Sequence, residues 1–435
     1  MGKNINWKEK YADKICKAEE AVKHIQSKDR VVVGHACSEP TVLVDAMVEG
    51  ARENEYRDVE VVHMVPMGEA KYCQPEMTEH FRHNAIFVGA STRKALAEKR
   101  ADFTPTFFSE VPELVRTTLR GNVALIHVSE PDEHGYCSYG LSCDYTKPGA
   151  EAADIIIAQV NQNMPWTMGD NFIHLSEIDY IVLAEEPVIE LQPPKIGEVE
   201  KKIGEHIASL VKDRDCLQLG IGAIPDAVLL FLKEKKDLGI HSEMFSDGVV
   251  ELIEAGVITN KYKQIDKGQC VATFLMGTKK LYQYVHKNPA VRMMPVDYVN
   301  NPRVIAQNDN MVSINSCVEV DLMGQVCSES IGLKQISGVG GQVDFVRGAQ
   351  MSKNGKTIIA MPATASKGSV SRIVPYITEG AAVTTSRNDV DYIVTEYGIA
   401  QLKGKTLRQR AEALIAIAAP QFQGYLLEEF ERRFG

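Results

Sequence analysis

The fold of this chain is decided by residues 217–225, which read Leu-Gln-Leu-Gly-Ile-Gly-Ala-Ile-Pro. A short apolar run, a Gly-x-Gly turn and a proline that suits the first turn of a helix follow one another. The same order occurs earlier, where residues 31–33 (Val-Val-Val) precede Gly34 and a helix is expected to start near Pro40. The offset of about 185 residues is too long for a solenoid repeat, so we expect two related α/β domains.

Short apolar runs alternate with helical segments along the rest of the chain, which is typical of mainly parallel sheets. These candidate strands lie at residues 59–63, 85–88, 123–128, 155–160, 178–183, 270–274, 311–314, 356–360 and 392–394. The prolines of residues 185–195 favour an extended linker. We therefore expect domains at 1–192 and 193–435, the second ending in helices over 407–434 that break at Pro420.

Composition excludes several classes of protein. The 435 residues carry a net charge of −10 and give a pI near 5.7, which argues against a basic nucleic-acid-binding surface. The nine cysteines are odd in number and contain no CxxC pair, so neither a disulfide framework nor a zinc site is expected. The polar amino-terminal stretch has no secretion signal, and no apolar run reaches the length of a membrane span. A cytoplasmic protein without nucleic-acid or membrane partners is expected.

The turn at Gly220, Ile221, Gly222, Ala223 and Ile224 would expose backbone N–H groups at a helix amino terminus. Such a turn can hold an anionic or carbonyl oxygen, although a purely structural tight turn explains the glycines equally well. Pro225 interrupts the GxGxxG pattern of dinucleotide-binding proteins, and no GxxxxGK[ST] loop is present. A non-catalytic nucleotide-binding protein is therefore a weaker hypothesis.

Glu243 lies in residues 241–248, His-Ser-Glu-Met-Phe-Ser-Asp-Gly, among turn-forming and apolar neighbours. A partly desolvated carboxylate is a better nucleophile and can form covalent intermediates. The alternative is an ordinary solvated loop glutamate.

Residues 337–345 form another glycine cluster, Ser-Gly-Val-Gly-Gly-Gln-Val-Asp-Phe, whose backbone can approach a ligand closely. The basic residues Lys356 and Lys367 follow it. His35, His63 and His134 do not form an HxH or HExxH pattern, so no metal site is expected.

Together these segments resemble the family I coenzyme A transferases, in the branch of 4-hydroxybutyrate and butyryl-CoA:acetate CoA-transferases, also described as acetyl-CoA hydrolase/transferases. The most specific blocks are LQLGIGAIPDAVL, GIHSEMFSDGVVELIEAGVITN, KQISGVGGQVDFVRGAQMS and AAVTTSRNDVDYIVTEYGIAQLKGKTLRQRAEALI. The resemblance covers nearly the whole chain and implies two α/β domains of the NagB/RpiA type.

The resemblance implies that Glu243 is the covalent catalyst and that no metal takes part. The implied coenzyme A contacts are Gly220, Ile221, Gly222, Ala223, Ile224, Gly338, Gly340, Gly341 and Lys356. The second glycine cluster is also expected to supply an oxyanion donor, and Lys367 is the second choice after Lys356.

The implied activity is ping-pong transfer of coenzyme A between a short-chain acyl-CoA and acetate through a glutamyl-CoA thioester. Acyl-CoA hydrolysis on the same scaffold is the alternative. Coenzyme A is then a substrate, no tightly bound cofactor is expected, and the partners are acyl-CoA and small carboxylates, with a possible homodimer. Tyr136, Met164 and Trp166 are candidates for the acyl pocket, although ordinary packing explains each of them.

Overall fold

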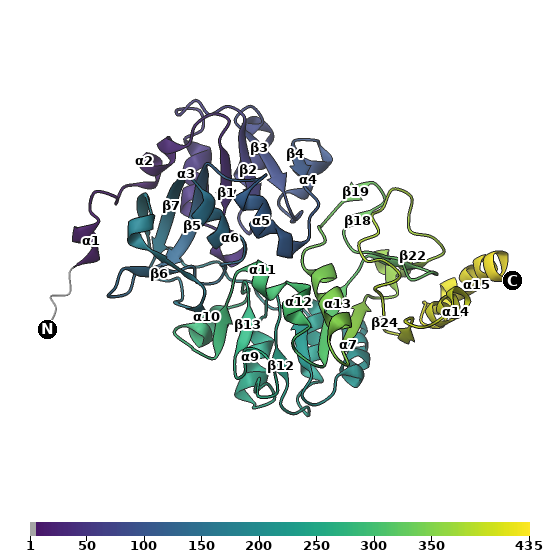
Figure 1. Cartoon of the computed structure of the whole chain (residues 1–435). Coiled ribbons are helices and arrows are strands. Elements are labelled where there is room, and N and C mark those ends of the chain that lie inside the picture. Colours follow the sequence, from purple (N-terminus) through teal and green to yellow (C-terminus); the bar gives the residue numbers. More distant parts are fainter. Residues whose placement is uncertain (1–5) are drawn as a thin grey trace. The chain divides into compact units, whose positions relative to one another are not determined.

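The computed structural model describes residues 6–435 (Figure 1). Residues 1–5, on which part of the expectation about a secretion signal rests, lie outside the described residues. The chain divides into two compact units, and the first comprises the described part of Met1–Leu191 together with Ala272–Tyr298. The second comprises Gln192–Val271 and Val299–Gly435. Residues 272–298 thus pack with the first unit, whereas the expected division into 1–192 and 193–435 assigns them to the second.

The first unit contains a sheet of seven strands that are all parallel, in the order β10-β7-β5-β1-β2-β3-β4. The strands are β1 (Arg30–Val33), β2 (Val59–His63), β3 (Phe81–Ala85), β4 (Ala101–Phe103), β5 (Val123–Ser129), β7 (Ile155–Asn161) and β10 (Tyr180–Ala184). Residues 123–129 are buried throughout, because a central parallel strand is covered on both faces.

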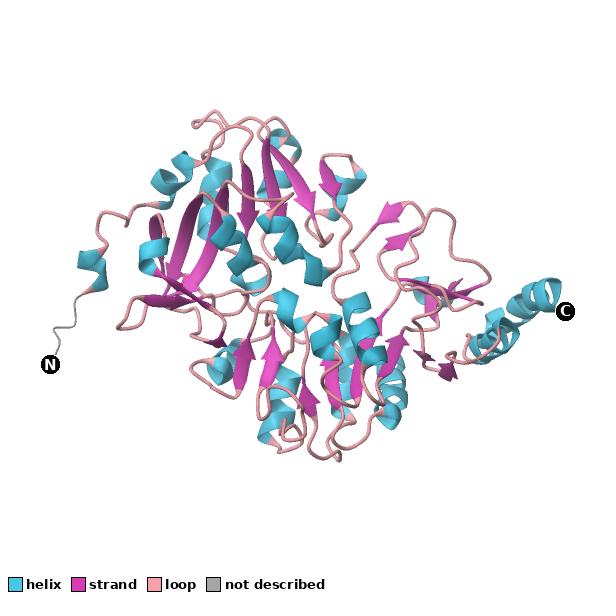
Figure 2. Cartoon of the chain, in the orientation of Figure 1, coloured by secondary structure: helices cyan, strands magenta, loops and turns pink. Residues whose placement is uncertain are grey.

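Helices accompany this sheet, as Figure 2 shows. They are α1 (Trp7–Lys10), α2 (Ala18–Ala21), α3 (Thr41–Glu49), α4 (Arg93–Ala97), α5 (Val111–Arg116), α6 (Thr146–Ala152), α10 (Lys279–Val285) and α11 (Val296–Val299, whose last residue belongs to the second unit). The short strands are β6 (Tyr136–Ser138), β8 (Met168–Gly169), β9 (Phe172–His174), β14 (Val291–Met293) and β13 (Cys270–Ala272, whose first two residues belong to the second unit). Leu43 and Met47 of α3 pack into the apolar core beside β1 and β2.

The second unit contains a six-stranded sheet in the order β12-β11-β15-β20-β24-β25, parallel except for the last strand. The strands are β11 (Cys216–Leu219), β12 (Gly239–Ile240), β15 (Met311–Ser316), β20 (Lys356–Ala360), β24 (Tyr392–Thr395) and β25 (Gly398–Gln401). The helices are α7 (Glu198–Leu210), α8 (Ala223–Leu230), α9 (Asp247–Glu254), α12 (Pro302–Ile305), α13 (Gln342–Met351), α14 (Leu407–Ala416) and α15 (Pro420–Phe434).

Seven two- or three-residue strands extend from this unit: β16 (Glu319–Asp321), β17 (Val326–Cys327), β18 (Ser330–Ile331), β19 (Lys334–Gln335), β21 (Thr364–Ala365), β22 (Val370–Ser371) and β23 (Ile373–Val374). The helical break at Pro420 is confirmed, since this residue begins α15. Helix α8 starts at Ala223, so Pro225 lies within its first turn, where a missing N–H leaves no hydrogen bond unmade.

Both sheets are mainly parallel and reverse their strand order beside their first strand, which confirms the expected fold class. β1 lies between β2 and β5, and β11 lies between β12 and β15. The strand order therefore reverses beside β1 in the first unit and beside β11 in the second. In open parallel sheets, ligands bind at the carboxyl ends of the strands at such a reversal. The Gly-x-Gly turn follows β11 at this position.

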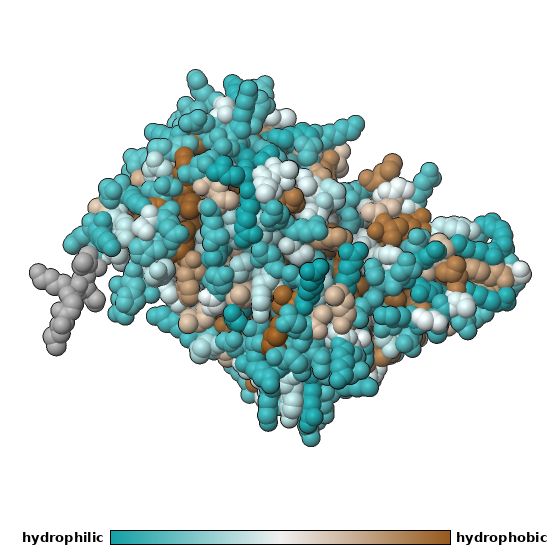
Figure 3. All heavy atoms as spheres, viewed as in Figure 1, coloured by the Kyte–Doolittle hydropathy of each residue, from teal (hydrophilic) through white to brown (hydrophobic). Residues whose placement is uncertain are grey.

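Among residues 6–435, no helix combines the length and apolar character needed to cross a bilayer. The face seen in Figure 3 is mostly hydrophilic, with apolar residues in smaller groups.

Candidate functional site

Glu243 follows the edge strand β12, whose unpaired side is bonded by side chains. Asn260 Oδ1 accepts a hydrogen bond from the Ile240 N–H at 2.8 Å, and the buried Lys263 Nζ donates to the Ile240 carbonyl at 2.9 Å. Ser242 Oγ then lies 3.0 Å from the Leu219 carbonyl and accepts from the Leu219 N–H at 3.2 Å. These contacts fix the Glu243 loop beside the end of β11, and hence beside the Gly220 turn.

The Glu243 carboxylate contacts two segments that are distant in the sequence. Asn300 Nδ2 donates a hydrogen bond to Glu243 Oε2 at 2.7 Å. A Cβ atom built on Gly341 would lie 1.9 Å from the same oxygen and 2.3 Å from Asn300 Nδ2. The carboxylate is half-buried, whereas Asn300 and Gly341 are buried. Glu243, Asn300 and Gly341 form the candidate site.

Gly341 is the residue that precedes α13, and no side chain within residues 6–435 caps this helix amino terminus. The N–H groups at the start of a helix lack intrahelical partners and carry partial positive charge, which favours an anion nearby. Gly340, with φ +53°, has the left-handed backbone that brings the chain into the helix. Gly341, at the end of the second glycine cluster, therefore lies beside the Glu243 carboxylate.

The Gly220 turn lies at the amino terminus of α8. Gly222 has φ +117°, a conformation that favours glycine, and Cβ atoms on Gly220 or Gly222 would meet nothing within 4 Å. Ile221 is 42% exposed, whereas the Ile224 side chain is buried. Ser246 Oγ donates to Asp226 Oδ1 at 3.2 Å, which ties α8 to the Glu243 loop. A ligand can reach the backbone of this turn but not the Ile224 side chain.

Lys356 lies away from the other candidates, and its assignment as a coenzyme A contact is not retained. It begins β20, where the register aligns it with Val312, next to Met311 and Cys216 at the starts of β15 and β11. Met244 is instead level with Leu219 at the end of β11, two residues and about 7 Å farther along the strands than Leu217, which is level with Lys356. Lys356 Nζ donates to the Leu210 carbonyl at 3.1 Å and lies 3.5 Å from Asp215 Oδ2. Its amine therefore bonds groups near the amino ends of the strands, whereas Glu243 lies near their carboxyl ends.

Asn300 is the site residue that sequence reasoning missed. It precedes Asn301 and Pro302, and Asn301 caps α12 by accepting a hydrogen bond from the Arg303 N–H. An Asn-Asn-Pro sequence is typical of a helix start, so the sequence does not indicate that the first asparagine contacts Glu243. The signal that identifies Asn300 is its burial, which only the structure shows, since this polar side chain has no exposed surface.

The histidines raised by the sequence lie outside this site. The buried His35 Nδ1 is 2.9 Å from Asp144 Oδ2, and burial lowers the pKa of His63 far below its ordinary value. His134 is exposed beside Glu133. Within residues 6–435, no group of three or more His, Cys, Asp or Glu side chains could hold a metal ion.

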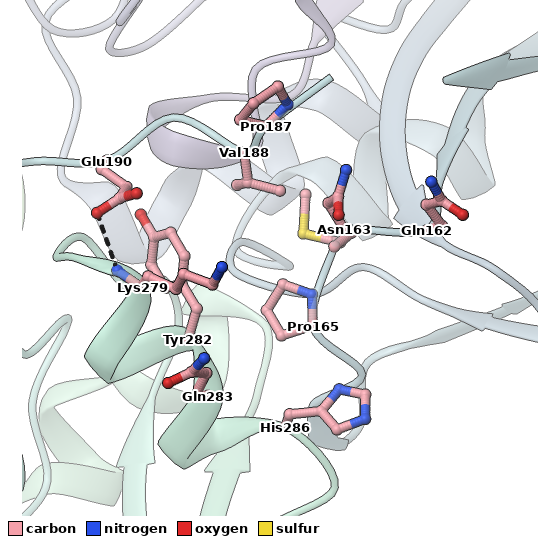
Figure 4. A pocket seen from close by; sticks show the side chains of 11 residues that line it. Gln162, Asn163, Pro165, Pro187, Val188, Glu190, Lys279, Tyr282, Gln283 and His286 are labelled. Carbon is pink, nitrogen blue, oxygen red and sulfur yellow. Dashed lines mark hydrogen bonds between the residues drawn. The ribbon is translucent and has the colours of Figure 1, made fainter. Parts of the chain in front are cut away.

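The first unit holds a cavity of about 320 Å³ (Figure 4). Met164 lines it, while the Trp166 ring packs at a tilt against Phe172 and Tyr136 is 46% exposed. Figure 4 shows Tyr282 and Gln283 on α10 facing Pro187 and Val188 across this space. The lining residues are Gln162, Asn163, Met164, Pro165, Pro187, Val188, Glu190, Lys279, Tyr282, Gln283 and His286.

Known proteins resemble this chain over its whole length. The acetyl-CoA hydrolase/transferase N-terminal domain matches residues 1–193, and the C-terminal domain of the same name matches residues 277–430. The 4-hydroxybutyrate coenzyme A transferase of Clostridium kluyveri is 64% identical over 99% of this chain and 100% of its own. The butyryl-CoA:acetate CoA-transferase of Anaerostipes caccae is 38% identical over 98% of each chain.

Solved structures also superpose on nearly the whole of this chain. RipA from Yersinia pestis superposes with a TM-score of 0.94 at 38% identity, covering 99% of each chain. The 4-hydroxybutyrate CoA-transferase from Porphyromonas gingivalis superposes with a TM-score of 0.85 at 45% identity, covering 99% of this chain and 100% of that one.

Proposed function

Because this chain belongs to the acetyl-CoA hydrolase/transferase family, we propose that it transfers coenzyme A between a short-chain acyl-CoA and acetate with Glu243 as the nucleophile. It is an acyl-CoA:carboxylate CoA-transferase, and coenzyme A is its substrate. The acyl groups that we propose are 4-hydroxybutyryl and butyryl, which the names of its relatives carry. The observation on which the site rests is the Glu243 carboxylate held between Asn300 and Gly341.

The reaction exchanges one thioester for another and so needs little driving force. Glu243 attacks the acyl-CoA carbonyl, which forms a mixed anhydride and releases the coenzyme A thiolate. The thiolate attacks the glutamyl carbonyl, which leaves a Glu243–CoA thioester and frees the first carboxylate. Acetate then attacks this thioester and the steps run in reverse. A carboxylate nucleophile suits this sequence, because each intermediate resembles the substrate that it replaces.

Each step passes through a tetrahedral oxyanion next to the Glu243 carboxyl group. Asn300 Nδ2 already donates to this group at 2.7 Å, and the amino terminus of α13 begins beside it at Gly341. Fixed donors of this kind stabilise developing negative charge without rearranging. The open space above Gly220 and Gly222 can admit part of coenzyme A, and we propose that coenzyme A binds at this turn. Gly338 and Gly340 complete the proposed contacts.

The proposed activity is tested by steady-state kinetics with one acyl-CoA donor and a panel of carboxylate acceptors. We expect parallel double-reciprocal plots for acyl-CoA and acetate, because the first carboxylate leaves before acetate reacts. The rate without any acceptor should be lower by at least about tenfold, since the site must keep water from the thioester. Rapid turnover without acceptor that acetate does not raise would instead identify an acyl-CoA hydrolase.

The position of Lys356 gives a second prediction. We expect Lys356→Met to leave the KM for acyl-CoA unchanged and to lower the free energy of unfolding by about 1–3 kcal/mol. The Asp215 side chain is only 4% exposed and would lose its cation, although it would still accept a hydrogen bond from the Lys212 N–H. Urea unfolding and KM measurements check both parts, with the exposed Lys353→Met as a matched control. A several-fold rise in KM at unchanged stability would restore Lys356 to the coenzyme A site.

We also propose that the enzyme works in the cytoplasm as a homodimer. All nine cysteines are free thiols, which a reducing compartment preserves. The dimer is proposed because twofold symmetric dimers are the commonest assemblies of soluble proteins, and sedimentation of the purified chain tests it.

A further inference from the structure

His241 and Asn300 connect the Glu243 loop to the segment before α12 by two hydrogen bonds. His241 Nε2 lies 2.8 Å from the carbonyl oxygen of Val299, and Asn300 Nδ2 lies 2.7 Å from Glu243 Oε2. The partners are separated by one residue on one segment and are adjacent on the other. The contacts therefore close a small ring, with the nucleophile and its amide donor on one side and the imidazole on the other.

The imidazole is suited to a fixed structural bond and not to proton transfer. His241 is fully buried, and burial lowers the pKa of its ring to about 4, so the ring is neutral at physiological pH. A carbonyl oxygen only accepts, so Nε2 carries the proton and donates to Val299. The neutral ring can therefore keep this bond at physiological pH.

The Asn300 amide depends on its backbone for its orientation. Its Oδ1 is buried and has no hydrogen-bond partner among residues 6–435, so its other amide atom does not orient it. The direction of Nδ2 is therefore set by the Glu243 carboxylate and by the position of the Asn300 backbone. The peptide group that joins Val299 to Asn300 presents its carbonyl to His241.

We propose that His241 is a positioning residue for the CoA-transfer reaction, holding Asn300 through the Val299 carbonyl at the distance that the Glu243 oxyanions require. This inference rests on the proposed function, because it assigns His241 a role in the placement of the amide donor. A displacement of about 1 Å in a donor or reacting group can lower a rate about 10²-fold, so one buried bond is enough to affect turnover.

The first test compares two amide replacements of His241. In H241Q the amide nitrogen of the new side chain occupies the region of Nε2, whereas the shorter side chain of H241N reaches only the region of Nδ1. We expect H241Q to keep kcat within about fivefold of the wild type and H241N to lose about 10- to 100-fold, with KM for acyl-CoA little changed in both. Equal losses in the two variants, at equal thermal stability, would reject a role for the Nε2 donor.

The second test is a double-mutant cycle for kcat with H241N and N300A. We expect N300A alone to lose about 10²–10³-fold, the cost of one oxyanion donor. If His241 acts through Asn300, adding H241N to N300A should lower kcat by less than about twofold. Losses that multiply in the double variant would overturn the proposal, because His241 would then act independently.

Failure of this inference is distinguishable from failure of the proposed function. If Glu243→Gln is inactive while N300A retains the wild-type kcat, His241 has no donor to position, yet Glu243 remains the nucleophile. If Glu243→Gln retains transfer activity, the proposed function fails and the inference fails with it. Far-UV circular dichroism and thermal unfolding of each variant exclude loss of the fold as the cause.

Discussion

The Glu243→Gln variant is expected to lose acetate-dependent CoA transfer by roughly 10⁴-fold or more, the scale seen when a covalent nucleophile is removed. The substitution conserves shape, and the new amide oxygen can still accept the hydrogen bond that Asn300 Nδ2 donates at 2.7 Å. The fold and the coenzyme A site should therefore persist while the nucleophilic carboxylate is lost. The kcat of transfer, measured with saturating acyl-CoA and acetate, checks the expected loss.

Trapping makes the same experiment specific to position 243. Borohydride reduces a thioester, so wild-type enzyme incubated with acyl-CoA alone should acquire a modification that peptide mass spectrometry places on Glu243. The Glu243→Gln variant should acquire none. The exposed Glu205→Gln on α7 is the matched control and should behave as the wild type. Full activity in Glu243→Gln, or a modification on another residue, would falsify the assignment of the nucleophile.

The parts of the fold that sequence predicted are those in which local pattern and burial agree. The run at 59–63 is mainly apolar and proved to be β2, and the strand, Gly-x-Gly turn and helix at 217–225 occur in the expected order. The strand expected at 85–88 is instead β3, Phe81–Ala85. The polar residues of β3 do not form the apolar pattern that predicts a buried strand. They are accommodated by hydrogen bonds to residues distant in the sequence, such as the one from Asn84 Nδ2 to Glu60 Oε1 at 2.8 Å.

The candidate site shows the same limit. Glu243 and the glycines could be chosen from their neighbours in sequence, since turns and glycine clusters are local features. Asn300 could not, because its role depends on a contact with a residue 57 positions away. Lys356 was chosen for its charge beside a strand, but the strand register places that charge at the amino edge of the sheet. The strand expected at 356–360 already begins with Lys356, so the choice gave more weight to charge than to position in the strand, although ligands bind at the carboxyl ends of parallel strands.

The Gly341→Ala variant is expected to lose about 10²–10³-fold in kcat, the cost of disturbing one oxyanion donor. The new methyl group would lie 1.9 Å from Glu243 Oε2 and 2.3 Å from Asn300 Nδ2, so both polar atoms must move. The backbone itself should accept alanine, because Gly341 has φ −92° and ψ 3°. Stability should therefore fall much less than activity, which kcat and thermal unfolding measured together would show.

Gly424→Ala is the matched control for Gly341→Ala. Gly424 lies within α15, and a Cβ atom there would meet nothing within 4 Å. Alanine is the better helix former by roughly 0.5–1 kcal/mol, so this variant should keep full activity and be slightly more stable. If Gly341→Ala also kept full activity, the carboxylate would not need its observed contact with the α13 amino terminus. The site would then lose the geometric reason for placing the oxyanion beside Gly341, whatever Glu243 does.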